Sequence, residues 1–209
     1  MKKSQKINDY VFVILSLLSS MAFLFCLIIK QKFIATQFLF FFLSMFLPNI
    51  IEFIFKLKIA PFMQLIYELY LILHFILGEI CNFYIVFNYY DTILHFTTAI
   101  LLSILGYSII HYYLDDNVIF IQLIFAFLFS ISCEFYWEIL EFSIDHFFDT
   151  NMQRFIKNGI ILQGHDAIKD TIKDMIVATM GSLTIVFLSK VKVIKNAKIS
   201  IKKLFTFSV

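Results

Sequence analysis

The chain has 209 residues, of which 61% are hydrophobic, 19% aromatic and only 15% charged, and its formal net charge is +2. Soluble domains carry about 25% charged residues, and the apolar runs here reach the roughly 20 residues that cross a bilayer. The composition therefore excludes an ordinary soluble protein. It predicts an all-α, polytopic membrane helix bundle formed by a single domain over residues 1–209.

Six apolar segments of membrane-spanning length follow one another, at about 10–29, 33–55, 62–80, 92–112, 117–142 and 168–189. The lysines before the first segment resemble the start of a signal peptide. That segment is longer than a signal-peptide core and no small-residue cleavage site follows it, so we predict an uncleaved first span. The sequence leaves the exact ends of the third and fifth spans open.

Two of the connections are long enough to carry structure of their own. Residues 81–91 are rich in aromatic side chains, which is typical of a re-entrant or interfacial segment. Residues 149–167 form the one long polar loop, and 190–209 form a basic tail. The three cysteines (Cys26, Cys81 and Cys133) are widely spaced and lie within or beside apolar runs, so we interpret them as packing residues.

The distribution of positive charge predicts the orientation of the spans, because cytoplasmic loops of membrane proteins are enriched in Lys and Arg. With six spans, both termini and the even-numbered connections share one side. That side collects Lys2, Lys3, Lys6, Lys56, Lys58, Lys190, Lys192, Lys195, Lys198, Lys202 and Lys203, whereas the other has Lys30, Lys32, Arg154, Lys157, Lys169 and Lys173. We therefore predict that both termini are cytoplasmic.

Four carboxylates follow the apolar part of the fifth span: Glu134, Glu138, Glu141 and Asp145. At about 100° per residue they fall within an arc of about 60° on one face of a helix. A carboxylate near hydrocarbon costs about 2.5 to 3.5 kcal/mol at the centre of a membrane helix, and the carboxyl end of a helix also disfavours anions. This acidic stripe therefore requires a cation, either a metal ion or a basic side chain.

Polar residues on three other spans share the membrane level of the acidic stripe in the predicted topology. Asp91 and His95 open the fourth span, Asp170 and Asp174 open the sixth, and Glu79 lies near the outer end of the third. Residues four apart face the same side of a helix. Carboxylates and an imidazole on facing helices are how bundle proteins bind Mn, Fe, Zn or Mg. We predict a divalent-metal site near the extracytoplasmic surface.

Simpler explanations remain open for each group. If the fifth span ends near Cys133, the four carboxylates are merely in water. An acid in the first turn of a helix, such as Asp91 or Asp170, is favoured by the helix dipole alone. His95 could be a hydrogen-bonded membrane histidine, as we expect for His74 and for Glu68 in the third span.

The loop cations Arg154 and Lys157 are more typical of a solvated surface, although they could pair with the acidic stripe or bind an anionic head group. The lysines of the tail suit anionic lipid rather than nucleic acid. There is no phosphate-binding glycine loop and no His-Glu-x-x-His zinc motif in the chain.

Several of these motifs, in order, resemble the YjdF family of small bacterial inner-membrane proteins. They are Leu-Gly-Glu ending at Glu79, Tyr-Asp-x-x-x-His ending at His95, Trp-Glu-x-x-Glu-Phe ending at Phe142, Asn-Met-Gln ending at Gln153 and Asp-Thr-x-x-Asp-Met ending at Met175. A looser similarity to VanZ-like proteins points to the cell envelope. The resemblance implies a multi-pass protein of the bacterial cell membrane but supplies no reaction.

The resemblance also sorts the candidate residues. It supports a shared polar set made of Glu79, Asp91, His95, Glu138, Glu141, Asp145, Asp170, Thr171 and Asp174. Within this set we predict that the metal ligands are Asp91, His95, Glu138, Asp170 and Asp174, and that Glu79, Asp145 and Thr171 are supporting groups. Glu134 stands outside the shared pattern, so we place it among the supporting groups.

Two classes of function follow. The first is a metal-dependent hydrolase or transferase, in which the metal lowers the pKa of a bound water. Its catalytic candidates are His95, Glu138 and Glu141, with Glu141 as general base. Its substrate would be a membrane lipid or a lipid-linked envelope precursor. The second is a non-catalytic protein that binds or carries an ion or a lipid at the same site.

Overall fold

The computed structural model describes residues 2–55, 59, 61–114, 118–157 and 159–188. Within them, six helical segments are long and apolar enough to cross a membrane: Lys6–Ile28, Lys32–Ile54, Pro61–Ile80, Tyr90–His111, Ile119–Phe148 and Lys169–Leu188. The protein is therefore a multi-pass, all-α membrane protein, as its composition predicts. The predicted basic tail and the turn at Asp115 and Asp116 lie outside the described residues.

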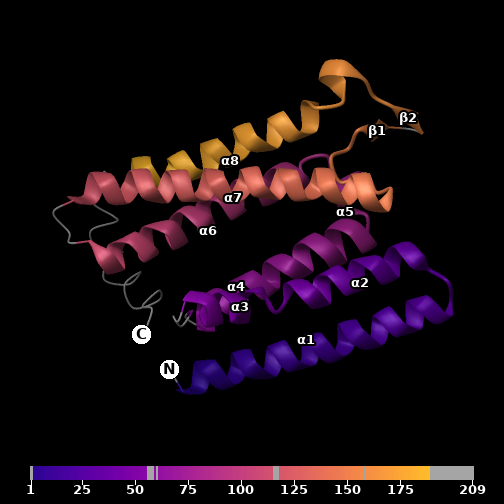
Figure 1. Ribbon diagram of the computed structural model, residues 1–209, viewed down its shortest axis with the longest axis horizontal. Helices are drawn as coiled ribbons and strands as arrows, with labels where there is room; N and C mark the ends of the chain where they lie inside the picture. Colours follow the sequence, from indigo (N-terminus) through magenta and orange to yellow (C-terminus); the bar gives the residue numbers. More distant parts are fainter. Residues whose placement is uncertain (1, 56–58, 60, 115–117, 158, 189–209) are drawn as a thin grey trace. The chain divides into compact units, whose positions relative to one another are not determined.

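The chain divides into two compact units, one ending at Tyr90 and the other beginning at Asp91. The first unit contains the helices α1 (Lys2–Ile28), α2 (Lys32–Ser44), α3 (Leu47–Phe55), α4 (Pro61–Leu71) and α5 (Phe83–Val86), and the π-helical segment η1 (Ile72–Ile80). α1 and α2 form an antiparallel hairpin (Figure 1), whose turn places Lys30 in a left-handed conformation with φ of 61°. The buried apolar core of this first unit is formed by Phe41 and Met45 together with Leu71 and Phe75.

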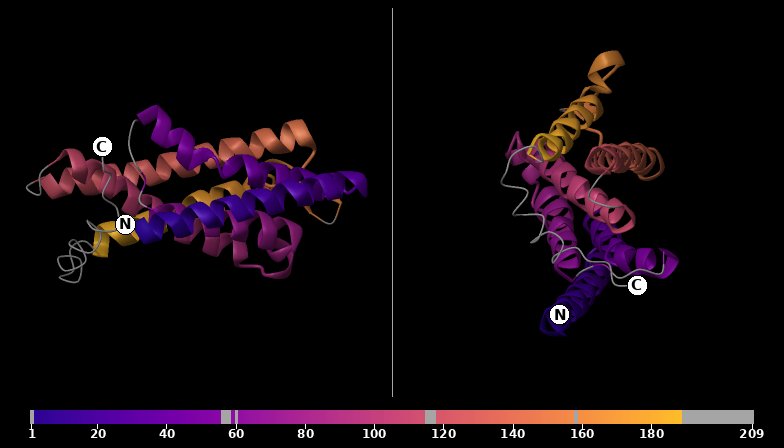
Figure 2. Two further views of the ribbon diagram at one scale, coloured as in Figure 1. Left: turned by 90° about the horizontal axis from the view of Figure 1, so that it is seen from below. Right: turned by 90° about the vertical axis from the view of Figure 1, so that its left-hand side faces the viewer.

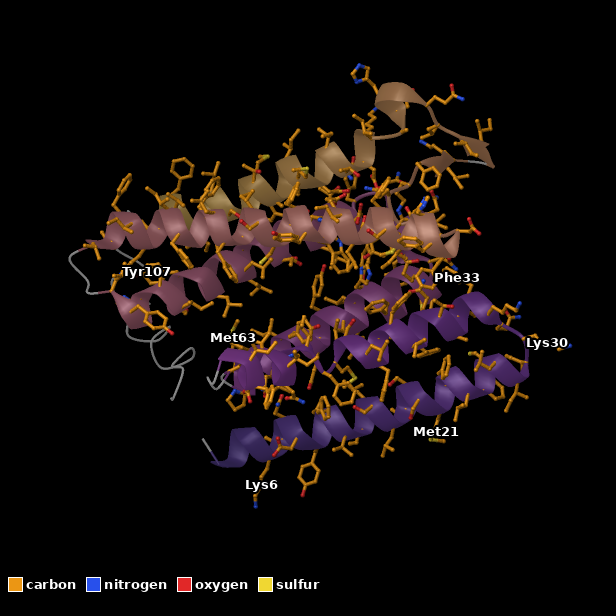
Figure 3. The ribbon with its side chains drawn as sticks, viewed as in Figure 1. Lys6, Met21, Lys30, Phe33, Met63 and Tyr107 are labelled. Atoms are coloured by element: carbon orange, nitrogen blue, oxygen red, sulfur yellow. The ribbon has the colours of Figure 1, made fainter. Side chains whose placement is uncertain are left out.

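Most of the outer surface of this hairpin is apolar, as expected of helices that face lipid. Figure 3 shows Met21 on the side of α1 that points away from α2, between Lys6 near one end and Lys30 beyond the other. Met21 is 66% exposed within the protein. A cationic residue at each end of a long apolar helix suits the two polar surfaces of a bilayer.

The second unit contains three long helices, α6 (Tyr90–Tyr113), α7 (Ile119–Phe148) and α8 (Lys169–Leu188). α7 and α8 run side by side in opposite directions (Figures 1 and 2). Their connection contains a two-stranded antiparallel hairpin, β1 (Ile156–Lys157) and β2 (Ile160–Ile161), and the 3-10 turn η3 (Gly164–Asp166).

Small residues in the second unit hold its three helices together at close range. Ser182 Oγ donates to Ser130 Oγ at 2.7 Å, and Ser130 Oγ donates to the carbonyl oxygen of Ala99 at 2.9 Å. A side chain at Gly181 would press against the carbonyl oxygen of Phe96. Such close approach is typical of membrane helices, where small residues replace hydrophobic driving force. This seam lies one turn from His95 and from Glu134, so it fixes the helices on which both residues stand.

α7 extends six residues beyond the predicted end of the fifth span, because it continues to Phe148 rather than ending at residue 142. It ends where Asp149 adopts the left-handed conformation, with φ of 52°. A left-handed residue after the last turn is a common helix stop. All four carboxylates of the acidic stripe therefore lie within one continuous helix.

Candidate metal centre

The acidic stripe is buried along its whole length inside the second unit. Glu134, Glu138, Glu141 and Asp145 are only 4% to 8% exposed and occupy one face of α7. The alternative in which these carboxylates are simply in water therefore does not hold. Burial makes each unneutralised carboxylate costly, so the groups that face the stripe decide its chemistry.

His95 on α6 contacts carboxylates through both of its ring nitrogens. Nδ1 lies 2.5 Å from Glu134 Oε1, and Nε2 lies 3.4 Å from Asp91 Oδ1. An ionised carboxylate only accepts hydrogen bonds, so the short contact with an ionised Glu134 places a proton on Nδ1. Nε2 faces Asp91, with an N–H in the imidazolium form and with a lone pair in the neutral form that a metal requires.

Two groups of side chains bring ligand atoms within 4.8 Å of one another: Asp91 with His95 and Asp174, and His95 with Glu134 and Glu138. His95 belongs to both. In the first group, the separation of Nε2 and Asp91 Oδ1 exceeds an ordinary hydrogen bond. It equals the separation of about 3.4 Å between two ligands that lie about 2.1 Å from one tetrahedral metal. The donor set of the first group thus suits a divalent metal.

Two buried carboxylates lack the hydrogen-bond partners that burial demands. Oδ1 of Asp174 accepts no hydrogen bond of good geometry from the described residues. The same is true of both oxygens of Glu138, although the hydroxyl of Thr171 interacts with that carboxylate. Lys173 Nζ lies 3.5 Å from that same Asp174 oxygen, at the outer limit of a hydrogen bond. Buried polar atoms without partners are rare in native proteins, so these oxygens indicate a site built for another ligand.

Glu141 and Asp145, by contrast, are occupied by the protein itself. Glu141 Oε1 accepts a hydrogen bond from Trp137 Nε1 at 2.8 Å, one turn earlier on α7. Asp145 accepts three hydrogen bonds, from Thr150 Oγ1 at 2.5 Å, Met152 N at 2.7 Å and Gln153 N at 2.9 Å. Asp145 therefore ties the start of the α7–α8 loop to α7.

The loop is also tied to α8. The side-chain amide of Gln153 donates to Thr171 Oγ1 at 2.9 Å. Thr171 follows Asp170, whose carboxylate interacts electrostatically with those of Asp91, Glu138 and Asp174. Asp170 therefore borders the site, although it does not belong to either group of potential ligands. Asp145, Gln153 and Thr171 together connect the ends of α7 and α8 that carry the acidic residues.

A family model described as "Predicted membrane protein (DUF2238)" matches residues 11–193. The chain belongs to the DUF2238 family. YjdF belongs to the same family, so the resemblance drawn from the motifs is confirmed. No curated protein and no solved structure matches the chain.

In this DUF2238 protein, the predicted ligands on α6, α7 and α8 lie together in the second unit. Glu79 belongs to the first unit, in η1, so its place in the site stays a prediction. His74 also belongs to the first unit, where its Nδ1 lies 2.5 Å from the hydroxyl of Tyr84. The similarity to VanZ-like proteins stays a prediction too.

Sequence alone did not predict that two cations of the DUF2238 protein lie near the acidic residues of the site. The charges of Arg154 and Lys173 interact with the carboxylates of both Asp91 and Asp170. Lys173 lies one turn after Asp170 and directly before Asp174. A cation near the start of a helix interacts unfavourably with the helix dipole. The position of Lys173 therefore could have predicted that nearby carboxylates stabilise its charge.

Proposed function

We propose that this protein holds a divalent metal ion through Asp91, His95 and Asp174, and that it is a metal-dependent hydrolase or transferase of the bacterial cell membrane. Its substrate is a membrane lipid or a lipid-linked envelope precursor, bound near the extracytoplasmic face. The observation that carries the proposal is the convergence of ligand atoms from Asp91, His95 and Asp174 within 4.8 Å of one another.

Charge supports a cation at this place. Besides Asp145, five carboxylates on α7 and α8 and the carboxylate of Asp91 surround the single imidazole of His95: Glu134, Glu138, Glu141, Asp170 and Asp174. Arg154 and Lys173 supply only two further positive charges. A divalent ion would offset two of the negative charges that remain, whereas a purely hydrogen-bonded cluster leaves the oxygens of Glu138 without a donor of good geometry.

Each residue then has a defined task. Glu134 accepts the proton of Nδ1 and so fixes the His95 ring with Nε2 toward Asp91, the arrangement by which carboxylates orient metal-binding histidines. A bound divalent metal would polarise a phosphoryl or acyl oxygen and make water acidic enough to attack near neutral pH. Glu138 is the better general base, since its oxygens accept no hydrogen bond of good geometry and have the Thr171 hydroxyl as a weak neighbour, whereas Glu141 accepts a well-formed bond from Trp137.

A lipid substrate is supported by the surface beside the stripe. Phe135, Tyr136 and Phe142 are 49% to 69% exposed and flank the buried carboxylates on the same helix. In a spanning helix such side chains face lipid or the aromatic belt at the membrane surface. A substrate that diffuses in the bilayer therefore meets the helix that carries the acidic stripe.

The proposal is tested by elemental analysis of protein purified without chelator, followed by turnover. Wild-type protein should contain close to one Mn, Fe, Zn or Mg ion per chain, and Asp174→Ala should contain almost none. Mixed with a bacterial lipid extract, the wild type should release a phosphate-containing or acyl product that chelator abolishes. Absence of metal in the wild type would reject the metal site. Metal without turnover, under all lipid conditions, would reject catalysis and leave the ion- or lipid-binding alternative.

A further inference from the structure

The hairpin in the loop between α7 and α8 has an apolar tip, although most of that loop is polar. Ile160 and Ile161 in β2 are 67% and 63% exposed. Successive residues of a strand point to opposite faces, so each face of the hairpin presents an isoleucine that the described residues leave largely uncovered. Exposed apolar side chains that gather in one place mark a contact with a partner or with a membrane.

The hairpin has a defined backbone structure that keeps this tip in place. β1 and β2 pair in register, and the amide of Leu162 donates to the carbonyl oxygen of Phe155 at 2.8 Å, which continues the pairing beyond both strands. In the sequence, Asn158 and Gly159 separate the strands, and Asn-Gly is a preferred pair for a two-residue hairpin turn. Gly159 has a φ of 76°, as such a turn requires. The tip is therefore held out from the protein rather than free to collapse onto it.

The loop is tied to the ends of two membrane-spanning helices, so the hairpin stays close to the membrane surface. Asp145 in α7 accepts the backbone amide of Gln153, whose side chain donates to Thr171 in α8. The side-chain amide of Asn151 exchanges two hydrogen bonds with the backbone of Ile156, at 2.8 and 2.9 Å, which ties the start of the loop to β1. Figure 1 shows the hairpin beside the end of α7 and the start of α8.

The apolar surface of the tip has counterparts at both helix ends. Phe147 and Phe148 close α7 and are 75% and 56% exposed, and Ile168 directly before α8 is 53% exposed. Aromatic side chains at the ends of spanning helices lie at the membrane–water boundary. Lipid therefore borders the loop where it leaves α7 and where it enters α8.

The chemistry of the tip favours lipid over a protein partner. Lys157 is exposed and is the cross-strand partner of Ile160. At a membrane surface, a lysine can lay its apolar stem beside acyl chains and direct its ammonium group to the head groups. A folded partner covers one face of a hairpin, whereas fluid lipid surrounds both. Exposed isoleucines on both faces are therefore better explained by lipid.

We propose that the hairpin inserts Ile160 and Ile161 into the membrane, at the boundary between head groups and acyl chains, with Lys157 directed to the head-group phosphates. This inference goes beyond the proposed function, because it requires neither a metal nor catalysis. It makes the α7–α8 loop a membrane contact that holds the acidic ends of α7 and α8 at the lipid surface.

Quenching by brominated lipid measures the position of the tip. The chain has one tryptophan, so Trp137→Phe provides a background without tryptophan fluorescence. In that background, Ile161→Trp in nanodiscs of phosphatidylcholine with brominated acyl chains should lose most of its fluorescence. Bromine near the head groups should quench most, because interfacial segments reach only about 5–10 Å into this boundary. His165→Trp is the matched control, since His165 is exposed in the same loop, and aqueous acrylamide should quench it instead.

A second measurement uses the unsubstituted protein and so does not depend on the folding of a variant. A lipid-soluble diazirine in phosphatidylcholine nanodiscs should label residues 155–162 more heavily than residues 163–167, as read by mass spectrometry after proteolysis. The double substitution Ile160→Asn and Ile161→Asn should lower the labelling of the hairpin several-fold and leave the labelling of α7 unchanged.

Either experiment can overturn the inference. Quenching of Ile161→Trp no greater than that of His165→Trp, or equal labelling of residues 155–162 and 163–167, would reject the membrane contact and assign the tip to a protein partner. Monodisperse elution of each variant in size-exclusion chromatography excludes loss of fold as the cause. The metal site is tested separately, because protein without metal that still shows strong quenching of Ile161→Trp would reject the metal proposal alone.

Discussion

His95 shows how one side chain can decide the roles of its neighbours. The Nδ1 contact with Glu134 is short and the Nε2 contact with Asp91 is longer, so the ring is oriented by one carboxylate and open toward the other. The same ring would ligate through Nδ1 if the metal lay between Glu134 and Glu138. With the metal at Nε2, Asp91 is a ligand and Glu134 orients the ring, and with the metal at Nδ1 these roles are reversed. Substitution of the two residues therefore distinguishes the two arrangements.

Substitution of these residues should separate ligands from orienting groups. We expect His95→Ala to lose its metal, because a ligand is removed outright. Glu134→Gln should bind metal about 10- to 100-fold more weakly, the usual cost of removing an orienting partner. Metal titrations with purified variants measure both effects. His74→Ala is the matched histidine control and should keep its metal. Complete loss of metal in Glu134→Gln with little change in Asp91→Asn would place the metal on the Nδ1 side.

A second prediction at this scale separates Glu138 from Glu141. We expect Glu138→Gln to keep most of its metal and to lose turnover by about 100-fold or more, the usual contribution of a general base. Glu141→Gln should retain most of its turnover, because Glu141 is already bound to Trp137. Product release by the two variants in the same lipid extract measures the difference. Equal losses in both variants would reject the assignment of Glu138.

The positions of the site residues could be predicted from sequence, whereas their hydrogen-bond partners could not. Spacing alone places Glu134, Glu138, Glu141 and Asp145 on one face, and the structure buries that face. Sequence does not say which neighbour satisfies each oxygen. The bond from Trp137 to Glu141 and the loop bonds to Asp145 depend on rotamers and on the path of residues 150–153. The bond between Trp137 and Glu141 is local to α7, whereas the bonds to Asp145 form only after the loop has turned back onto the helix.

The elements themselves follow the predicted spans, and the departures have local causes. The second span breaks at Met45 and Phe46 between α2 and α3, just before Pro48, whose ring is tolerated only in the first turn of a helix. The third span changes to π-helical geometry over Ile72–Ile80, which hydrophobic periodicity does not reveal. Length and hydropathy identify spans because a bilayer imposes both, whereas breaks within a span depend on single residues.

The seam between α6 and α8 gives a stability prediction. Gly181→Ala places a methyl group against the backbone carbonyl of Phe96, which cannot turn aside, so one helix must move. We expect a destabilisation of about 1–3 kcal/mol, as for overpacked cores. Thermal unfolding in detergent measures it. Thr184→Ala on the same helix is the control, because the exposed Thr184 hydroxyl bonds to the carbonyl of Met180 in α8 itself. A loss for Thr184→Ala as large as that for Gly181→Ala would contradict this account of the seam.

The loop between α7 and α8 gives another prediction at the scale of elements. Asp145→Ala removes the acceptor of three hydrogen bonds, so the amides of Met152 and Gln153 lose their partner. We expect faster hydrogen exchange at residues 150–153, because their amides are then less protected from solvent. Exchange measured by mass spectrometry tests this effect. Ser143→Ala is the control, since its exposed hydroxyl bonds only to Ile139 in its own helix. Unchanged exchange in Asp145→Ala would show that the loop is held by other contacts.

At the scale of the whole molecule, charge is segregated along the chain rather than mixed. Eleven of the 17 basic residues fall on the side assigned to both termini, and six on the side of the α7–α8 loop. Positive charge that remains in the cytoplasm during insertion orients membrane proteins. The candidate metal centre would then open toward the outer surface of the membrane, where envelope precursors are processed.

This orientation can be tested with reporter fusions to the full chain. Fusions after Lys203 and in the turn at Asp115 and Asp116 should report the cytoplasm, because both belong to the positively charged side. A fusion near Lys157, in the hairpin between α7 and α8, should report the exterior. Alkaline phosphatase, which is active only outside, and green fluorescent protein, which fluoresces only inside, give opposite signals at each position. An exterior signal after Lys203 would invert the protein, and the site would then face substrates of the cytoplasmic leaflet.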